Sequence, residues 1–123
     1  MQTFTKVERL SSKIEIDKLL EKGKSFHSSL FKIIWQKTTE GTVPAQIIIS
    51  VPKRLFKKAV DRNRLKRLIR EAYRKNKKIL CENLNNKKVQ LMFIYKAKKI
   101  VEYIEVEEEI INALKKLSSA INS

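Results

Sequence analysis

Few residues of this chain have a type and spacing that could perform chemistry on their own. His27 is the only histidine and Cys81 the only cysteine. His27 stands beside Ser28 and Ser29 with no acid in view to orient its ring, and a catalytic triad is defined by the geometry of three groups. A single cysteine near a helix end is usually a packing residue. We therefore predict no catalytic residue on the protein itself.

Metal and phosphate chemistry have equally little support. Glu107, Glu108 and Glu109 form a run of carboxylates, but successive helical residues point about 100° apart, so the run favours a solvated helix start. A structural zinc site needs about four Cys or His ligands, and the two glycines cannot build a glycine-rich phosphate loop. We predict no metal site and no cofactor bound by the protein alone.

The chain is strongly basic, and its charge is concentrated in one stretch. Twenty-eight Lys and Arg oppose 13 Asp and Glu, for a net charge of +15. Residues 53–78 hold thirteen of these cations against only Asp61 and Glu71. A salt-bridged helix surface would carry interleaved acids, whereas an uncompensated run repels itself. The stretch is therefore predicted to bind a polyanion such as a nucleic acid.

The elements that must position this charge can be read along the chain. Ser12 and Glu15 form a capping-box pattern and Gly23 suits a helix end, which predicts a helix over 13–22. Residues 26–37 read as one strand, and 47–51 as a second strand that forms a hairpin with it. A helix is expected over 59–80, Asn85 and Asn86 break it, and a buried strand over 89–95 and a helix from about 104 follow.

This order, α-β-β-α-β-α, predicts an α+β sandwich in one domain, 1–123. A strand, helix, strand order normally gives parallel strands joined by a right-handed crossover. Trp35 and Phe93 are expected in the core. Phe56 and Tyr73 lie inside the basic stretch and could be either core residues or stacking platforms for bases.

The predicted helix over 59–80 has two unlike faces. At 100° per residue, one side is an apolar stripe that includes Leu65, Leu68, Ile69, Ala72 and Ile79. The opposite side is almost wholly cationic, and Arg62 and Arg64 flank the stripe. This cationic side holds Asn63, Lys66, Arg67, Arg70 and Arg74.

Composition also bounds the compartment. No apolar run approaches the roughly 18 residues of a membrane span, the first residues are polar without a secretory pattern, and the single cysteine excludes an intrachain disulfide. We expect a cytoplasmic protein with no membrane contact and no disulfide-linked partner.

The sequence from Ser50 to Arg54, followed by 59–74 (AVDRNRLKRLIREAYR), closely resembles the signature of the bacterial ribonuclease P protein component. Arg62-Asn63-Arg64 with Lys66, Arg67 and Arg70 matches that family's RNR motif. The likeness extends over nearly the whole chain.

The resemblance implies a role that composition cannot give. In that family the catalyst is an RNA that, with magnesium, hydrolyses the 5′ leader off precursor tRNA. The protein subunit binds this catalytic RNA and contacts the leader, so both RNAs are expected partners and magnesium is expected through the RNA. The family fold also has a left-handed βαβ crossover. The predicted RNA-binding residues are Lys53, Arg54, Lys58, Arg62, Asn63, Arg64, Lys66, Arg67, Arg70 and Arg74.

Two features differ from the family pattern. The leader cleft, where relatives often carry aromatics, corresponds here to Ile16, Leu20 and Ile34, and aliphatic groups stack poorly on bases. The stretch 55–58 is one residue longer than usual and lacks the expected glycine. Asn63 could bond a base edge or a 2′-hydroxyl, or could be a helix-start residue. The alternative function is a general structured-RNA-binding protein of ribosomal type, which charge alone does not separate from the first.

Overall fold

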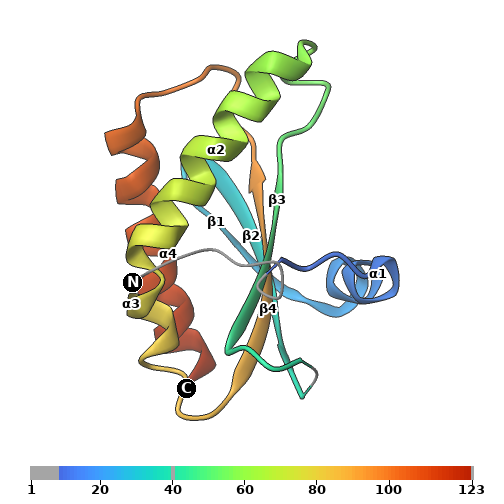
Figure 1. The fold of residues 1–123 in the computed structure, drawn as a ribbon, viewed down its shortest axis with the longest axis vertical. Coiled ribbons are helices and arrows are strands. Elements are labelled where there is room, and N and C mark those ends of the chain that lie inside the picture. Colours follow the sequence, from blue (N-terminus) through green and yellow to red (C-terminus); the bar gives the residue numbers. More distant parts are fainter. Residues whose placement is uncertain (1–8, 40, 123) are drawn as a thin grey trace.

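A four-stranded sheet lies between one helix on one face and three on the other in the computed structural model, which describes residues 9–39 and 41–122 (Figure 1). The helix α1 crosses one face, and α2, α3 and α4 cover the opposite face. Along the chain the elements are α1 (Lys13–Lys22), β1 (Lys24–His27), β2 (Phe31–Thr38), β3 (Ala45–Ser50), α2 (Ala59–Asn76), α3 (Lys78–Cys81), β4 (Lys88–Tyr95) and α4 (Tyr103–Ile121).

The strand order in the sheet is β1-β2-β4-β3, so β4 lies between β2 and β3. It pairs antiparallel with β2 and parallel with β3. The predicted hairpin between the strands that became β2 and β3 is therefore wrong. The apolar pattern of β4 predicts burial on both faces of the sheet, which α1 provides on one face and α2 and α4 on the other, but it does not determine which strands flank β4.

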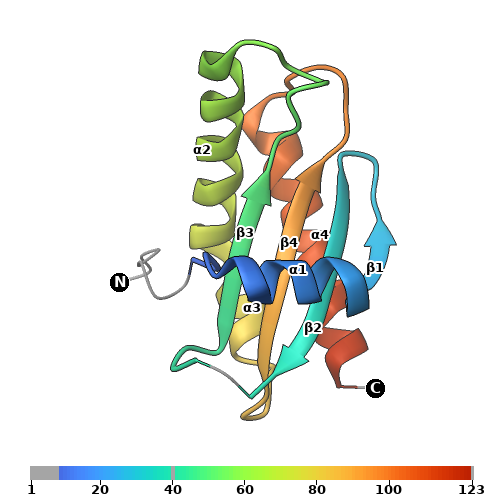
Figure 2. The same cartoon turned by 90° about the vertical axis from the view of Figure 1, so that its right-hand side faces the viewer.

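The crossover from β3 through α2 to β4 is left-handed. In Figure 2 the helix α2 lies behind the sheet, β3 and β4 both run upward, and β4 stands to the right of β3. The general rule of right-handed crossovers does not hold here, whereas the handedness implied by the family resemblance does.

Two hydrophobic clusters hold the layers together. The larger one joins alternate residues of the sheet, among them Phe31, Ile33 and Phe93, to the buried faces of α2 and α4. In α4 these are Val106, Ile110, Leu114, Leu117 and Ile121, all fully buried. The smaller cluster, on the other face, packs α1 on the sheet and is built of Leu10, Leu19, Ile34 and Met92.

A row of three glutamines crosses the sheet on the face that α1 covers. It lies two residues along the strands from the pair of Ile34 and Met92, which packs against α1. Gln36 pairs with Gln90, which pairs with Gln46, in the strand register. The Gln36 amide donates to Gln90 Oε1 at 3.0 Å, and the Gln90 amide donates to Gln46 Oε1 at 3.4 Å. Gln90 is 1% exposed, and these two bonds satisfy its buried amide.

The single strand predicted over 26–37 is in fact two antiparallel strands, β1 and β2. The chain turns at residues 28–30, where Ser28 Oγ accepts from the Phe31 amide at 3.2 Å. The Leu30 amide donates to Glu109 Oε1 at 3.0 Å. Side-chain acceptors thus replace the strand partners that these amides would otherwise need.

The basic helix ends earlier than predicted. The turn at Lys77 separates α2 from the short α3. The Asn76 side chain donates to the Ala72 carbonyl at 2.9 Å, and such local side-chain bonds compete with the helical ladder. Asn85 and Asn86, with φ of 52° and 68°, then turn the chain into β4.

The first helix matches its prediction, with a different reason for its glycine. Ser12 caps α1 by accepting from the Glu15 amide at 3.4 Å. Gly23 has an ordinary φ of −68°, so a left-handed cap is not what it provides. A Cβ built there would lie 2.6 Å from Ile34 Cγ2 and 2.5 Å from the Leu19 carbonyl oxygen. Gly23 is required because the end of α1 touches the sheet.

Candidate nucleic-acid interface

The helix α2 buries one side and presents the other, as its pattern predicts. Leu65, Ile69, Ala72 and Tyr73 are 0% exposed. Tyr73 is therefore a core residue, with its ring centroid 6.3 Å from that of Phe93. The outward side, called the motif face below, consists of Asn63, Arg64, Lys66, Arg67, Arg70 and Arg74, each exposed or half-buried.

Arg70 lies at the centre of the motif face in an electrostatically unfavourable place. Partial burial, and then the neighbouring charges of Arg9 and Arg67, lower the pKa of Arg70. Within the described residues, the only ion pairs join Glu71 to Arg74 and to Lys75. No carboxylate of residues 9–39 and 41–122 therefore forms an ion pair with Arg9, Arg67 or Arg70, and an anion bound among them would relieve their mutual repulsion.

Two hollows flank this point and share Arg70. One, of about 590 Å³, lies along the motif face between Arg64, Arg67, Arg70 and Arg74. The other, of about 330 Å³, lies between the start of α1, β3 and α2. Its apolar side includes Ile16 and its cationic side includes Lys66 and Arg70. Because both are lined by Arg70, the two hollows adjoin on a basic surface, and the smaller one is partly apolar.

Arg62 has a contact that its place in the sequence did not reveal. Its Nη1 donates to the carbonyl oxygens of Phe56, at 2.8 Å, and Lys57, at 2.9 Å. Phe56 is half-buried and packs against Tyr95, with ring centroids 6.1 Å apart. Arg62 thus fastens the longer 55–58 loop to the first turn of α2, and Phe56 anchors that loop to the core.

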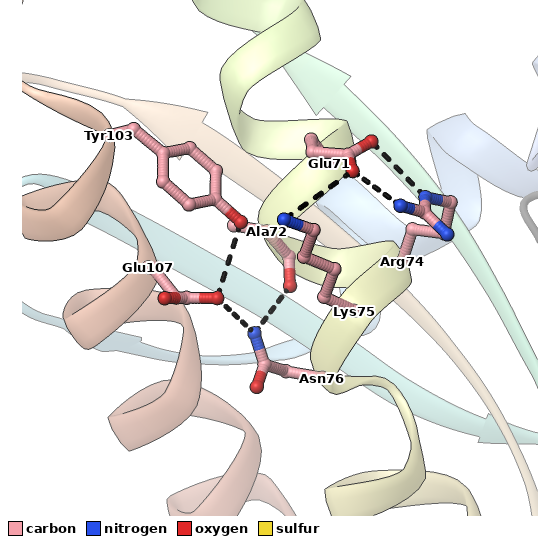
Figure 3. Close-up of polar contacts among 7 residues, drawn as sticks. All are labelled: Glu71, Ala72, Arg74, Lys75, Asn76, Tyr103 and Glu107. Carbon is pink, nitrogen blue, oxygen red and sulfur yellow. Dashed lines mark hydrogen bonds and ion pairs between the residues drawn. The ribbon is translucent and has the colours of Figure 1, made fainter. Parts of the chain in front are cut away.

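The motif face ends in a cluster around Glu71 (Figure 3). The Arg74 guanidinium donates to both carboxylate oxygens of Glu71, through Nε to Oε2 at 3.1 Å and through Nη2 to Oε1. Lys75 Nζ lies 3.9 Å from Oε1. The bond from Arg74 lowers the pKa of Glu71, and the same bond raises the pKa of Arg74. Both groups are therefore held in their charged forms.

Beside that cluster, α2 is tied to the start of α4. Glu107 Oε2 accepts from Asn76 Nδ2 at 3.0 Å and from the Tyr103 hydroxyl at 3.2 Å (Figure 3). Burial, with the nearby Glu107 carboxylate, raises the pKa of Tyr103 to about 12. Lys75 Nζ lies 5.5 Å from the centre of the Tyr103 ring, a cation–π contact. Glu107 and Glu109 thus bond to the fold, whereas Glu108 is exposed as the solvated helix start predicts.

The three residues predicted for the leader cleft lie in different environments. Ile34 is 5% exposed and supports α1 from beneath. Ile16 is half-buried and lines the smaller hollow. Leu20 is 51% exposed on the outer side of α1. Only Ile16 and Leu20 thus present surface to a ligand.

The remaining basic candidates lie at the start of α2. Lys53 and Arg54 are exposed in the turn after β3, and Lys58 is the exposed residue before the helix. Sequence reasoning missed Arg9, an isolated cation that reaches Arg70 because Leu10 bonds to Ile47 of β3 at 2.8 Å. Nothing at position 9 itself signals this approach.

The described residues that could serve in catalysis or metal binding do not come together in a site. Lys96 Nζ lies 3.3 Å from His27 Nδ1, so the neighbour of that exposed histidine is a cation. Cys81 is half-buried in α3. Among the described residues, no three His, Cys, Asp or Glu side chains gather in a way that could hold a metal ion. No helix in that part of the chain is long and apolar enough to cross a membrane.

These features define a small α+β domain with a mixed four-stranded sheet and a cationic helix on its surface. A sequence model of the ribonuclease P protein family, described as "Ribonuclease P", matches residues 4–118. The chain is 30% identical to the ribonuclease P protein component of Porphyromonas gingivalis, over 98% of this chain and 90% of that one. It is 35% identical to that of Clostridium novyi, over 90% and 94%.

A solved structure agrees with these relatives. The RNase P protein from Thermotoga maritima superimposes with a TM-score of 0.73 at 27% identity, covering 89% of this chain and 96% of that one. The chain belongs to the ribonuclease P protein family.

Proposed function

We propose that the protein is the RNA-binding subunit of a ribonuclease P. In this proposal the RNA partner, with magnesium, removes the 5′ leader of precursor tRNA and supplies the catalysis. The protein's own residues bind and orient RNA. Membership of the family supports this role.

The observation that carries the proposal is the uncompensated charge at the centre of the motif face. Partial burial, and then the neighbouring charges of Arg9 and Arg67, lower the pKa of Arg70, and none of these three arginines forms an ion pair within the described residues. Guanidinium groups match phosphate oxygens in a fixed fork geometry. A folded RNA backbone can supply phosphates to such a surface without any base being read. We assign this surface to the catalytic RNA.

We assign the smaller hollow to the precursor's leader. It combines an aliphatic side at Ile16 with cations at Lys66 and Arg70, which suits one single strand with apolar base faces and a charged backbone. Because Ile16 is not aromatic, its contribution per nucleotide should be smaller than the roughly 1–3 kcal/mol of an aromatic stack.

The test is reconstitution with the ribonuclease P RNA encoded by the same genome and a 5′-labelled precursor tRNA. The purified protein alone should leave the precursor intact. The RNA alone should be slow at low magnesium, and adding the protein should restore cleavage at the mature 5′ end, because the protein's cations replace part of the metal's screening.

Two results would contradict the proposal. One is leader removal by protein from which all RNA has been removed. The other is a protein that binds ribosomal RNA as tightly as the ribonuclease P RNA and leaves precursor cleavage unchanged, which would support the general RNA-binding alternative.

A further inference from the structure

Among the described residues, Glu71 is the one acid that lines the larger hollow of the motif face. The other charged residues there are Arg64, Arg67, Arg70 and Arg74. If the hollow receives phosphates, a carboxylate inside it repels them, and by charge alone Glu71 weakens RNA binding. Glu71 can favour RNA binding only if another effect of its side chain outweighs this repulsion.

The contact between Glu71 and Arg74 provides such an effect. Both of its oxygens accept from Arg74, in the side-on arrangement through Nε and Nη2 (Figure 3). A two-point contact of this kind fixes the plane of the guanidinium, which a single bond would not. The pair stands three residues apart on one helix, so the backbone of α2 defines where Arg74 lies.

Residues of α4 also contact the cluster around Glu71. Glu71 Oε1 also attracts Lys75, and Lys75 lies over the Tyr103 ring of α4. Tyr103 is in turn bonded to Glu107, which accepts from Asn76 of α2 (Figure 3). The end of the motif face is thus braced against a second helix, and Arg74 belongs to a connected set of contacts.

We propose that Glu71 is a positioning residue for RNA binding: it holds the Arg74 guanidinium in the orientation in which that group meets a phosphate of the catalytic RNA. The inference rests on the proposed function and adds a residue with the opposite charge to its binding surface. A flexible arginine loses rotamer freedom when it binds, whereas one already held by Glu71 has lost that freedom before the RNA arrives. The gain from this prior ordering exceeds the repulsion between Glu71 and the phosphates.

This proposal and simple electrostatics predict opposite signs for one experiment. Glu71→Ala removes a negative charge from an RNA-binding surface, so charge alone predicts tighter binding. If Glu71 positions Arg74, the same change weakens binding to the ribonuclease P RNA by about two- to tenfold, the range expected for ordering one long side chain. The matched control is Glu108→Ala, which makes the same charge change at an exposed residue of α4 and should leave the affinity equal or slightly higher.

A double-variant cycle shows whether Glu71 acts through Arg74. Arg74→Ala should weaken binding and flatten the plot of log K against log salt by about 0.7–0.9. In the Arg74→Ala background, Glu71→Ala should no longer weaken binding and should tighten it, because only the repulsion is left to remove. Melting temperatures of all four variants, each an exposed or half-buried position replaced by a good helix former, show that every protein tested is folded.

The outcomes separate the two levels of the argument. Tighter binding by Glu71→Ala in the Arg74 background and weaker binding in the parent protein support the inference. Tighter binding in both backgrounds, or equally weaker binding in both, overturns it. If Arg64→Ala and Arg67→Ala weaken binding in the same assay, the proposed function stands whichever result Glu71 gives. If Arg64→Ala and Arg67→Ala leave the affinity unchanged, the assignment of the motif face to RNA binding is wrong.

Discussion

Replacing Arg62 and Arg67 by alanine should affect different properties of the protein, although both residues belong to the same basic helix. Arg62 donates two hydrogen bonds to the carbonyl oxygens of Phe56 and Lys57, at 2.8 and 2.9 Å. Arg67 is exposed on the motif face. Arg62→Ala should therefore act on folding, and Arg67→Ala on RNA binding.

The size of the Arg62 effect follows from these contacts. A hydrogen bond to a charged group contributes roughly 1.5–3 kcal/mol when it is well shielded, and here one of the two bonds is exposed to solvent. We expect Arg62→Ala to lower the free energy of unfolding by about 1–3 kcal/mol, which in domains of comparable size corresponds to roughly 4–12 °C in Tm. Arg67→Ala should change stability by less than about 0.5 kcal/mol.

The assay is a pair of measurements on each variant. Urea unfolding and thermal melting report stability, and filter binding to the ribonuclease P RNA over a series of salt concentrations reports the number of phosphate contacts. Arg67→Ala should flatten the salt plot by about 0.7–0.9. Arg62→Lys, which keeps the charge but has a shorter side chain without the planar guanidinium, should fall between the parent and Arg62→Ala in stability. If Arg62→Ala melts like the parent and loses as much salt dependence as Arg67→Ala, the loop contact has no structural importance and our division of the helix is wrong.

Three further substitutions test the packing and electrostatics. Leu65→Ala should cost about 2–5 kcal/mol in urea unfolding because Leu65 is fully buried, and an unchanged midpoint would show that α2 is not packed as described. Gly23→Ala should cost about 1–3 kcal/mol, since its Cβ would meet Leu19 and Ile34 at 2.5 and 2.6 Å; wild-type stability there would mean that α1 can move off the sheet freely. The raised pKa of Tyr103, about 12 against an ordinary 10, means that its neutral form stabilises the fold below pH 10 and that this contribution is lost as the pH rises towards 12. The advantage of the parent over Tyr103→Phe in urea unfolding should accordingly shrink over that interval, and an advantage that grows with pH would reverse the assigned sign.

Local patterns predicted much of the fold because their causes lie close together in sequence. The two faces of α2 follow from a 3.6-residue period, and Leu65, Ile69 and Ala72 are buried as that period requires. Ser12 caps the first helix within three residues of its partner. The motif face was predictable for the same reason.

Apart from the early end of α2, where Asn76 bonds to the Ala72 carbonyl four residues away, the errors involve partners that are distant in sequence. The turn before β2 depends on Glu109, which bonds to the Leu30 amide from 79 residues away. The place of β4 between β2 and β3 depends on pairings that no local pattern encodes. In the candidate site, the approach of Arg9 to Arg70 depends on the bridge between the N-terminal segment and β3. A periodic pattern says which side of an element is buried, but not what covers it.

The place of β4 has a consequence for how the protein can be made. Of the four strands it is the last to be synthesised, yet it lies in the interior of the sheet, and both of its neighbours precede it. While the chain emerges from a ribosome, β1 and β2 can pair as a local hairpin, but one edge of β2 and the paired edge of β3 must wait for residues 88–95. Unpaired apolar strand edges are prone to bind other chains. Chains truncated before Lys88 should therefore aggregate, and the full-length protein should acquire its sheet only after most of its length has left the ribosome.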